Sequence, residues 1–62
     1  MTTGEKIREA RRKRGLTQVE LADAAGLRQS AVSMIERGRI EPSLATLHSL
    51  AAALGCRPAK LL

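Results

Sequence analysis

Residues 15–38 read GLTQVELADAAGLRQSAVSMIERG, and this stretch decides the fold. Thr17 and Glu20 have the spacing of a capping box. The Thr17 hydroxyl can accept a hydrogen bond from the third amide of a helix, while Glu20 reaches back to the Thr17 amide. Gly26 is able to adopt the left-handed conformation that ends a helix. We therefore expect a helix over residues 18–25.

A second helix is expected after a very short turn, over residues 29–37. At about 100° per residue, Ala31, Val32 and Ile35 fall within one sector, which predicts that this stripe faces the core. The opposite sector carries side chains with no packing role, namely Gln29, Ser30, Ser33, Met34 and Arg37. The outer face of this helix is therefore available to contact another molecule.

The rest of the chain predicts three more helices. One covers about residues 4–14. Another starts after Ser43 as its N-cap. Its expected core stripe is Leu44, Leu47, Leu50, Ala51 and Leu54. A short last helix begins at Pro58, a favourable first helical residue, and Leu61 and Leu62 are expected to pack back on the core. Strands are disfavoured, because β-branched residues never alternate with polar ones over a useful length. The expected fold is all-α, a compact bundle of about five short helices in a single domain, residues 1–62.

Composition favours a polyanionic partner. Eleven Lys and Arg face six Asp and Glu in 62 residues, a formal charge of +5. A basic excess suits nucleic acid or an acidic membrane surface. Proteins that bind RNA or single strands usually stack bases on aromatic rings, and this chain has no Phe, Tyr or Trp. Double-stranded DNA is therefore favoured.

Several other functions are disfavoured. No apolar run approaches the roughly 20 residues of a membrane span, and no signal peptide is recognisable, so we expect a cytoplasmic protein without a membrane partner. Cys56 has no second cysteine to pair with, and one Cys with His48 cannot build a zinc site. No nucleophile or pair of carboxylates is arranged for catalysis. The chain is expected to be a non-enzyme with no cofactor or metal.

With these residues in view, the stretch from 15 to 38 resembles the helix-turn-helix of the phage λ-type repressor and Cro family, also called the XRE-like family. The likeness extends over nearly the whole chain. IREARRKRGL, residues 7–16, looks like the first helix of that family, and EPSLATLHSLAAALG, residues 41–55, looks like its fourth. The resemblance implies a λ-repressor-like domain with its helix-turn-helix at about residues 17–37.

The resemblance implies that Gln18 binds a DNA phosphate and braces Gln29. A helix amino terminus offers free amides and partial positive charge, which independently suits phosphate beside Gln18. Gln29 can pair with adenine N6 and N7, and Ser30 can bond several base edges. Met34 suits either a thymine methyl group or a protein partner. The expected base-reading residues are Gln29, Ser30, Ser33 and Met34.

The expected phosphate ligands flank this face or lie in neighbouring segments: Gln18, Arg28, Arg37, Arg39, Ser43 and Arg11. The resemblance also implies a largely buried salt bridge between Arg11 and Glu36. Two residues depart from the family pattern. Arg28 stands where the family usually has a Ser or Thr cap, and Glu41 lies in a loop that tends to be basic in relatives.

The expected function is sequence-specific DNA binding as a transcriptional regulator or repressor. One helix reads only a few base pairs, so a homodimer on a palindromic operator is expected. An alternative is the antitoxin of a toxin–antitoxin pair, which would also bind a toxin; a toxin or effector-domain partner therefore stays open. A third interpretation, a module that binds only proteins, leaves Gln18, Gln29 and the basic excess without a purpose.

Overall fold

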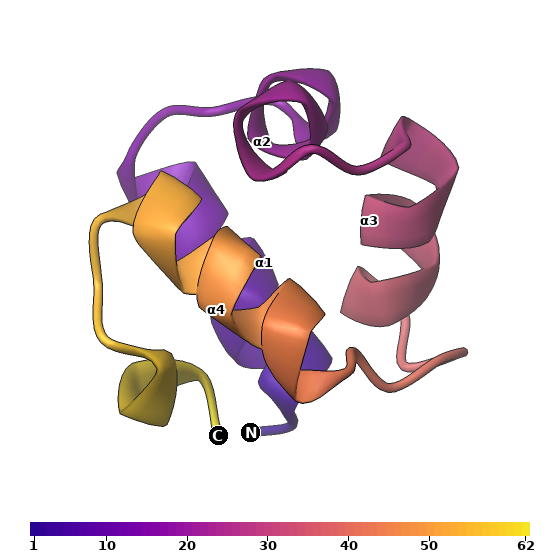
Figure 1. The fold of residues 1–62 in the computed structure, drawn as a ribbon, viewed down its shortest axis with the longest axis vertical. Helices are drawn as coiled ribbons and strands as arrows, with labels where there is room; N and C mark the ends of the chain where they lie inside the picture. Colours follow the sequence, from indigo (N-terminus) through magenta and orange to yellow (C-terminus); the bar gives the residue numbers. More distant parts are fainter.

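The computed structural model describes residues 1–62 as four α-helices and one short 3-10 helix. The elements are α1 (Thr3–Lys13), α2 (Gln18–Ala25), α3 (Gln29–Glu36), α4 (Leu44–Leu54) and η1 (Pro58–Leu61). Figure 1 shows α4 overlying α1, with α2 across one end of this pair, α3 to the side and both chain termini at the opposite end. The structure has no strand, so the all-α prediction is confirmed.

The fifth element differs from the expected helix. It is a single 3-10 turn, in which the Lys60 amide bonds to the Arg57 carbonyl and the Leu62 amide to the Ala59 carbonyl. Four residues beginning with a proline, which has no amide hydrogen, are too few for a ladder of bonds between residues four apart. The bundle therefore has four α-helices rather than five.

The two helices of the motif begin at the predicted residues. The Thr17 hydroxyl accepts from the Glu20 amide at 3.0 Å, and the Thr17 amide donates to the Glu20 carboxylate at 2.8 Å. Gly26 ends α2 with φ at 70°, a left-handed conformation that favours glycine. The prediction of a helix over residues 18–25 is confirmed, while α3 ends at Glu36, one residue earlier than expected.

A second capping box starts α1, and the sequence prediction missed it. The Thr2 hydroxyl accepts from the Glu5 amide at 3.1 Å, and the Thr2 amide donates to the Glu5 carboxylate at 2.8 Å. The helix therefore begins at Thr3 and not at Gly4. The Thr-x-x-Glu pattern that predicted α2 is present here as well.

The core is aliphatic and drawn from all five elements. It consists of Ile7, Leu21, Ala22, Val32, Ile35, Leu47, Leu50, Ala51, Leu54 and Leu61. The prediction that Leu44 and Leu62 pack in the core is wrong, because Leu44 is 73% exposed and Leu62 is 64% exposed. A helical side chain tilts toward the amino terminus, so Leu44, the first residue of α4, extends beyond the packed turns. Leu62 follows η1 and lies outside its turn.

Gly4 sets how closely α1 approaches α3. A Cβ atom at this position would collide with the backbone carbonyls of Ile35 and Glu36. Only glycine lets the two helices meet backbone to backbone here, and this contact brings the interior face of α1 against the end of α3. None of the helices combines the length and the hydrophobicity of a transmembrane segment.

Candidate nucleic-acid interface

The outer face of α3 is open to solvent along most of its length. Gln29 and Ser30 are exposed in its first turn, and Met34, one turn further, is 40% exposed. Ser33 is half-buried and accepts a hydrogen bond from Arg37 Nη2 at 2.9 Å. The structure thus places all four predicted base-reading residues on one helix, with Gln29 and Ser30 at its amino end.

Gln18 and Gln29 lie in direct contact, although they belong to different helices. Gln29 Nε2 donates to Gln18 Oε1 at 2.8 Å. Gln18 is the first residue of α2 and Gln29 the first of α3, so this bond links the amino ends of the two helices. Gln18 Nε2 in turn donates to Glu36 Oε1 at 3.1 Å, a bond that the sequence prediction did not include.

Glu36 and Arg11 form a buried, two-pronged ion pair. Arg11 Nε donates to Glu36 Oε2 at 2.7 Å, and Arg11 Nη2 donates to Glu36 Oε1 at 3.0 Å. The Glu36 side chain is fully buried and that of Arg11 is 11% exposed. Arg11 Nη1 donates to the Leu16 carbonyl at 2.9 Å. This pair ties α1 to the end of α3 and to the segment before α2.

A second arginine reaches the same carboxylate. Arg8 Nε lies 3.5 Å from Glu36 Oε1, and its side chain is more exposed than that of Arg11. The sequence prediction missed Arg8, although its position three residues before Arg11 places both on one side of α1. Glu36 therefore meets donors from α1 and α2, and no buried side-chain nitrogen or oxygen lacks a partner.

Opposing influences act on the Glu36 carboxyl. Burial alone raises its pKa, but hydrogen bonds from Arg11 and Gln18, together with the positive charge of Arg11, outweigh burial and hold the pKa below its ordinary value. The hydrogen bond to Glu36 raises the pKa of Arg11 despite its burial. Both groups are therefore charged near neutral pH.

Two predicted phosphate ligands make hydrogen bonds to other groups of the protein. The guanidinium of Arg11 is buried and shared between Glu36 and Leu16, so the phosphate role predicted for Arg11 does not fit its position. The Ser43 hydroxyl caps α4, where it accepts from the Thr46 amide and donates to the Thr46 hydroxyl. Ser43 is still exposed, at the open amino terminus of α4.

Arg28, Arg37 and Arg39 are exposed around α3. Arg28 is the N-cap residue of α3 and makes no side-chain capping bond. Its guanidinium has no acceptor to offer the helix, so the first amides of α3 remain uncapped. An arginine beside uncapped amides suits an anion more than an ordinary helix start does. Glu41 is exposed in the loop before α4 and reduces the positive charge there.

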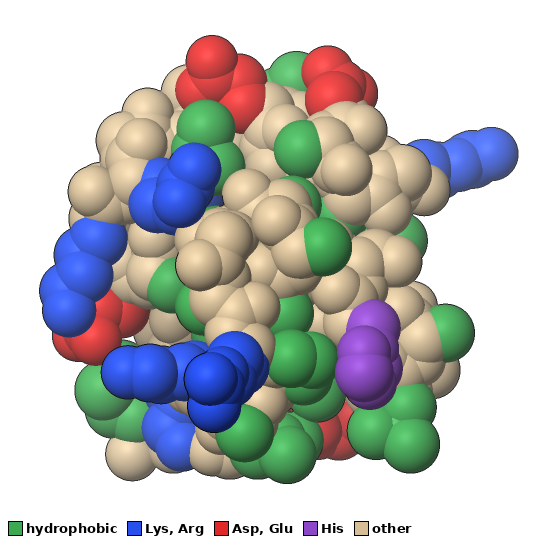
Figure 2. Space-filling model, turned by 60° about the vertical axis from the view of Figure 1, so that its left-hand side comes forward, with side chains coloured by type: hydrophobic (Ala, Val, Ile, Leu, Met, Phe, Trp, Pro, Cys, Tyr) green, Lys and Arg blue, Asp and Glu red, His purple; other side chains and the backbone are tan.

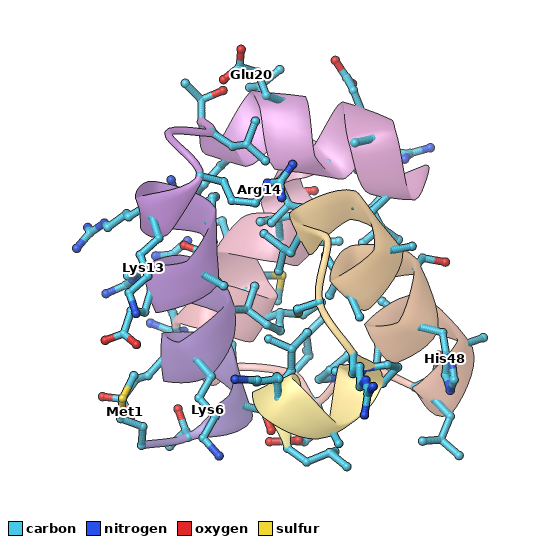
Figure 3. All side chains as sticks on the ribbon, turned by 90° about the vertical axis from the view of Figure 1, so that its left-hand side faces the viewer. Met1, Lys6, Lys13, Arg14, Glu20 and His48 are labelled. Carbon is cyan, nitrogen blue, oxygen red and sulfur yellow. The ribbon has the colours of Figure 1, made fainter.

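The four consecutive basic residues 11–14 lie in different surroundings. Arg12, Lys13 and Arg14 are exposed, whereas Arg11 is buried; the Arg14 guanidinium lies near Gly55 at the end of α4. Figure 3 shows Lys6 and Lys13 along α1 and Arg14 near the end of α4. Figure 2 shows most Lys and Arg side chains on the left and lower part of the face in view, with acidic side chains at the top and also beside the basic ones at the lower left.

His48 and Cys56 are far from forming a ligand set. No three His, Cys, Asp or Glu residues are grouped so that they could hold a metal ion. His48 is exposed on α4, and Cys56 is half-buried against the core.

Comparison with known proteins gives a consistent result. A family model described as helix-turn-helix matches residues 7–61. The immunity repressor protein of Bacillus phage phi105 is 51% identical over 55 residues, which cover 89% of this chain and 38% of the repressor. An HTH-type transcriptional regulator of Methanothermobacter thermautotrophicus is 47% identical over 49 residues, covering 79% of this chain and 71% of that protein. The chain thus spans well under half of the phage repressor.

Solved structures share the whole fold. The restriction-modification controller protein C.AhdI from Aeromonas hydrophila superimposes with a TM-score of 0.94 at 40% identity, covering 97% of this chain and 91% of that one. The P22 c2 repressor in complex with a synthetic operator gives a TM-score of 0.94 at 37% identity, with coverage of 100% and 94%.

Proposed function

Because the chain belongs to the helix-turn-helix family of the λ-repressor and Cro type, whose model matches residues 7–61, we propose that it binds double-stranded DNA sequence-specifically as a transcriptional regulator. In this proposal α3 enters the major groove with its amino end first. We further propose that residues 1–62 form one DNA-binding domain and that it acts in the cytoplasm.

The bond between Gln18 and Gln29 is the observation that carries the proposal. It joins the two helix amino termini and leaves Gln29 with one N–H hydrogen and its Oε1 atom unused. The N–H can donate to adenine N7, and Oε1 can accept from adenine N6. Ser30, Ser33 and Met34 are the further proposed base-reading residues. Proposed phosphate ligands are Gln18, Arg28, Arg37, Arg39 and the start of α4 at Ser43.

A single copy reads too little DNA for specific binding. With eight residues, α3 is about 12 Å long and spans only a few base pairs. We propose that two copies bind a palindromic operator with their α3 helices about 34 Å apart, one turn of the duplex. The P22 c2 repressor, which shares this fold, is bound to an operator in its structure. The names of the relatives are repressors and regulators, which gives no support to the antitoxin alternative.

Selection from a library of random duplexes tests this function. The enriched sequences should contain two inverted half-sites one helical turn apart. The logarithm of the affinity for the selected duplex should fall linearly with the logarithm of salt concentration, by about 0.9 for each phosphate neutralised. A library that stays random after selection, or an affinity that does not change with salt, would contradict the proposal.

A further inference from the structure

The geometry points to Glu36 as a positioning residue for base reading: its buried carboxylate sets the amide orientation of Gln18 and, through Gln18, that of Gln29. This inference rests on the proposed function, since it concerns how the proposed reading residue is held. Glu36 would never touch DNA. It would act across two hydrogen bonds from the interior of the protein to the exposed end of α3.

The first step follows from the chemistry of a carboxylate. An ionised carboxylate only accepts hydrogen bonds, whereas a glutamine amide has a donating end and an accepting end. Gln18 must therefore turn Nε2 toward Glu36 Oε1, as it does at 3.1 Å. The opposite orientation would bring two oxygens together with no hydrogen between them. Once this bond forms, the Oε1 atom of Gln18 is directed to its other neighbour.

The second step transmits this orientation to Gln29. Since Gln18 presents Oε1, Gln29 must present Nε2, and this bond is 2.8 Å long. Gln29 keeps one N–H hydrogen and one carbonyl oxygen for DNA, which matches adenine N7 and N6. We call Glu36, Gln18 and Gln29 with their two hydrogen bonds the relay. If both glutamine amides were reversed, Gln29 Oε1 would accept from Gln18, and Gln29 would keep two N–H donors, which match guanine N7 and O6. The orientation of the relay thus selects between two purines.

Glu36 is suited to set this orientation because it cannot reorient itself. Its side chain is fully buried, and Arg11 holds both carboxylate oxygens at 2.7 and 3.0 Å. Gln18 is half-buried and Gln29 is exposed, so each of them alone could turn its amide freely. Burial therefore decreases outward from Glu36 through Gln18 to Gln29, and the buried carboxylate at the inner end sets the orientation of the other two side chains.

The test separates positioning from stability with three proteins. In the double variant Arg11→Met and Glu36→Leu, an apolar pair replaces the ion pair, which often preserves folding. The control Arg8→Met removes the weaker partner of Glu36 and leaves the relay intact. The base pair that Gln29 reads is first identified as the position of the selected duplex at which Gln29→Ala loses its base preference. Affinities of the 62-residue chain and of each variant are then measured on four duplexes that carry A, G, C or T at this position.

The wild type and the Arg8→Met control should prefer adenine over guanine by the factor typical of a bidentate contact, about 5- to 150-fold. In the double variant this ratio should fall at least about fivefold, while its melting temperature stays near that of the wild type. A purely structural Glu36 predicts an unchanged ratio once folding is restored, and that result would overturn the inference alone. A wild type without any base preference would overturn the proposed function as well.

A measurement on the wild type covers the case in which the double variant unfolds. The chain contains two glutamines and no asparagine, so only two side-chain amide groups appear in its nuclear magnetic resonance spectrum. Scalar couplings across the hydrogen bonds should join Gln18 Nε2 to the Glu36 carboxyl carbon and Gln29 Nε2 to the Gln18 carbonyl carbon. Observation of both couplings supports the inference, and absence of either one in the folded protein overturns it.

Discussion

Replacing Arg11 by methionine should reverse the response of the protein to mild acid. In the wild type, Glu36 is buried with Arg11, Gln18 and Arg8 as donors, and its pKa lies below the ordinary value of 4.5. Without Arg11, burial becomes the dominant influence, so the pKa of Glu36 should rise above that value. The carboxyl group can then gain a proton and stay inside, rather than remain as a buried, poorly compensated charge.

The size of the loss follows from that proton. At pH 7, protonating a carboxyl with an ordinary pKa of 4.5 costs about 3 kcal/mol. Because Glu36 can take up a proton at this cost, its buried charge cannot lower the free energy of unfolding of Arg11→Met by more than this amount. A domain of 62 residues is stable by about 3–9 kcal/mol in total. A loss of about 3 kcal/mol should therefore lower the melting temperature by roughly 12–24 °C. In Glu36→Leu the buried partner is an arginine, which cannot lose its proton, so about 3–5 kcal/mol should be lost at any pH from 5 to 8.

The pH dependence of the two proteins has opposite sign. A lowered pKa in the folded state contributes stability above about pH 4.5, which is lost as the pH falls through the folded value. This is the wild type. A raised pKa contributes stability that is fully present below about pH 4.5 and is lost as the pH rises through the folded value. This is Arg11→Met, which should become more stable as the pH falls from 7 to 5.

Thermal melts from pH 3 to pH 7 measure these effects for the wild type, both single variants and the double variant Arg11→Met and Glu36→Leu, because the wild type loses this stability only below about pH 4.5. The double variant should recover most of the stability and lose the pH dependence that Glu36 causes. Strictly additive losses of the two single variants would refute the pairing. If Arg11→Met became less stable as the pH falls from 7 to 5, the argument about the pKa of Glu36 would be refuted.

Two further changes test the packing of α1 and the cap of α3. Gly4→Ala should gain about 1 kcal/mol from helix propensity, yet its Cβ would collide with carbonyls of α3, so we expect a net loss of about 1–3 kcal/mol; a raised melting temperature would contradict the close approach. Arg28→Ser supplies the missing cap and should stabilise the free protein by about 1 kcal/mol. The same variant should weaken binding to all duplexes evenly, and unchanged binding would speak against Arg28 as a phosphate ligand.

The sequence predicted those parts of the fold that depend on local chemistry. The capping box at Thr17 and the glycine at position 26 determine α2 through neighbours in the chain, and both were readable. Leu44 was misplaced because helical periodicity says which side a residue faces, but not where the packed turns end. Leu44 lies on the helical face of the core stripe, but it is in the first turn of α4, where no packed neighbour covers it.

The site was predictable as a set of residues but not as a network. Arg11, Gln18, Gln29 and Glu36 were all recognised through the resemblance, in pairs. The bond between Gln18 and Glu36 joins those pairs, and it depends on how the first residue of α2 meets the last residue of α3, which spacing along the chain does not reveal. The competing role for Arg11 at a phosphate could be judged only once its burial was known.

The base preference of Gln29→Ala tests the central claim most directly. Half-sites obtained by selection are varied one position at a time, and the affinities of the wild type and of Gln29→Ala are compared. An unchanged melting temperature first shows that Gln29→Ala is folded. If α3 reads DNA through Gln29, the variant should lose about 1–3 kcal/mol of discrimination at one position in each half-site, with little change in non-specific binding. A folded variant that keeps the full preference at every position would contradict this claim.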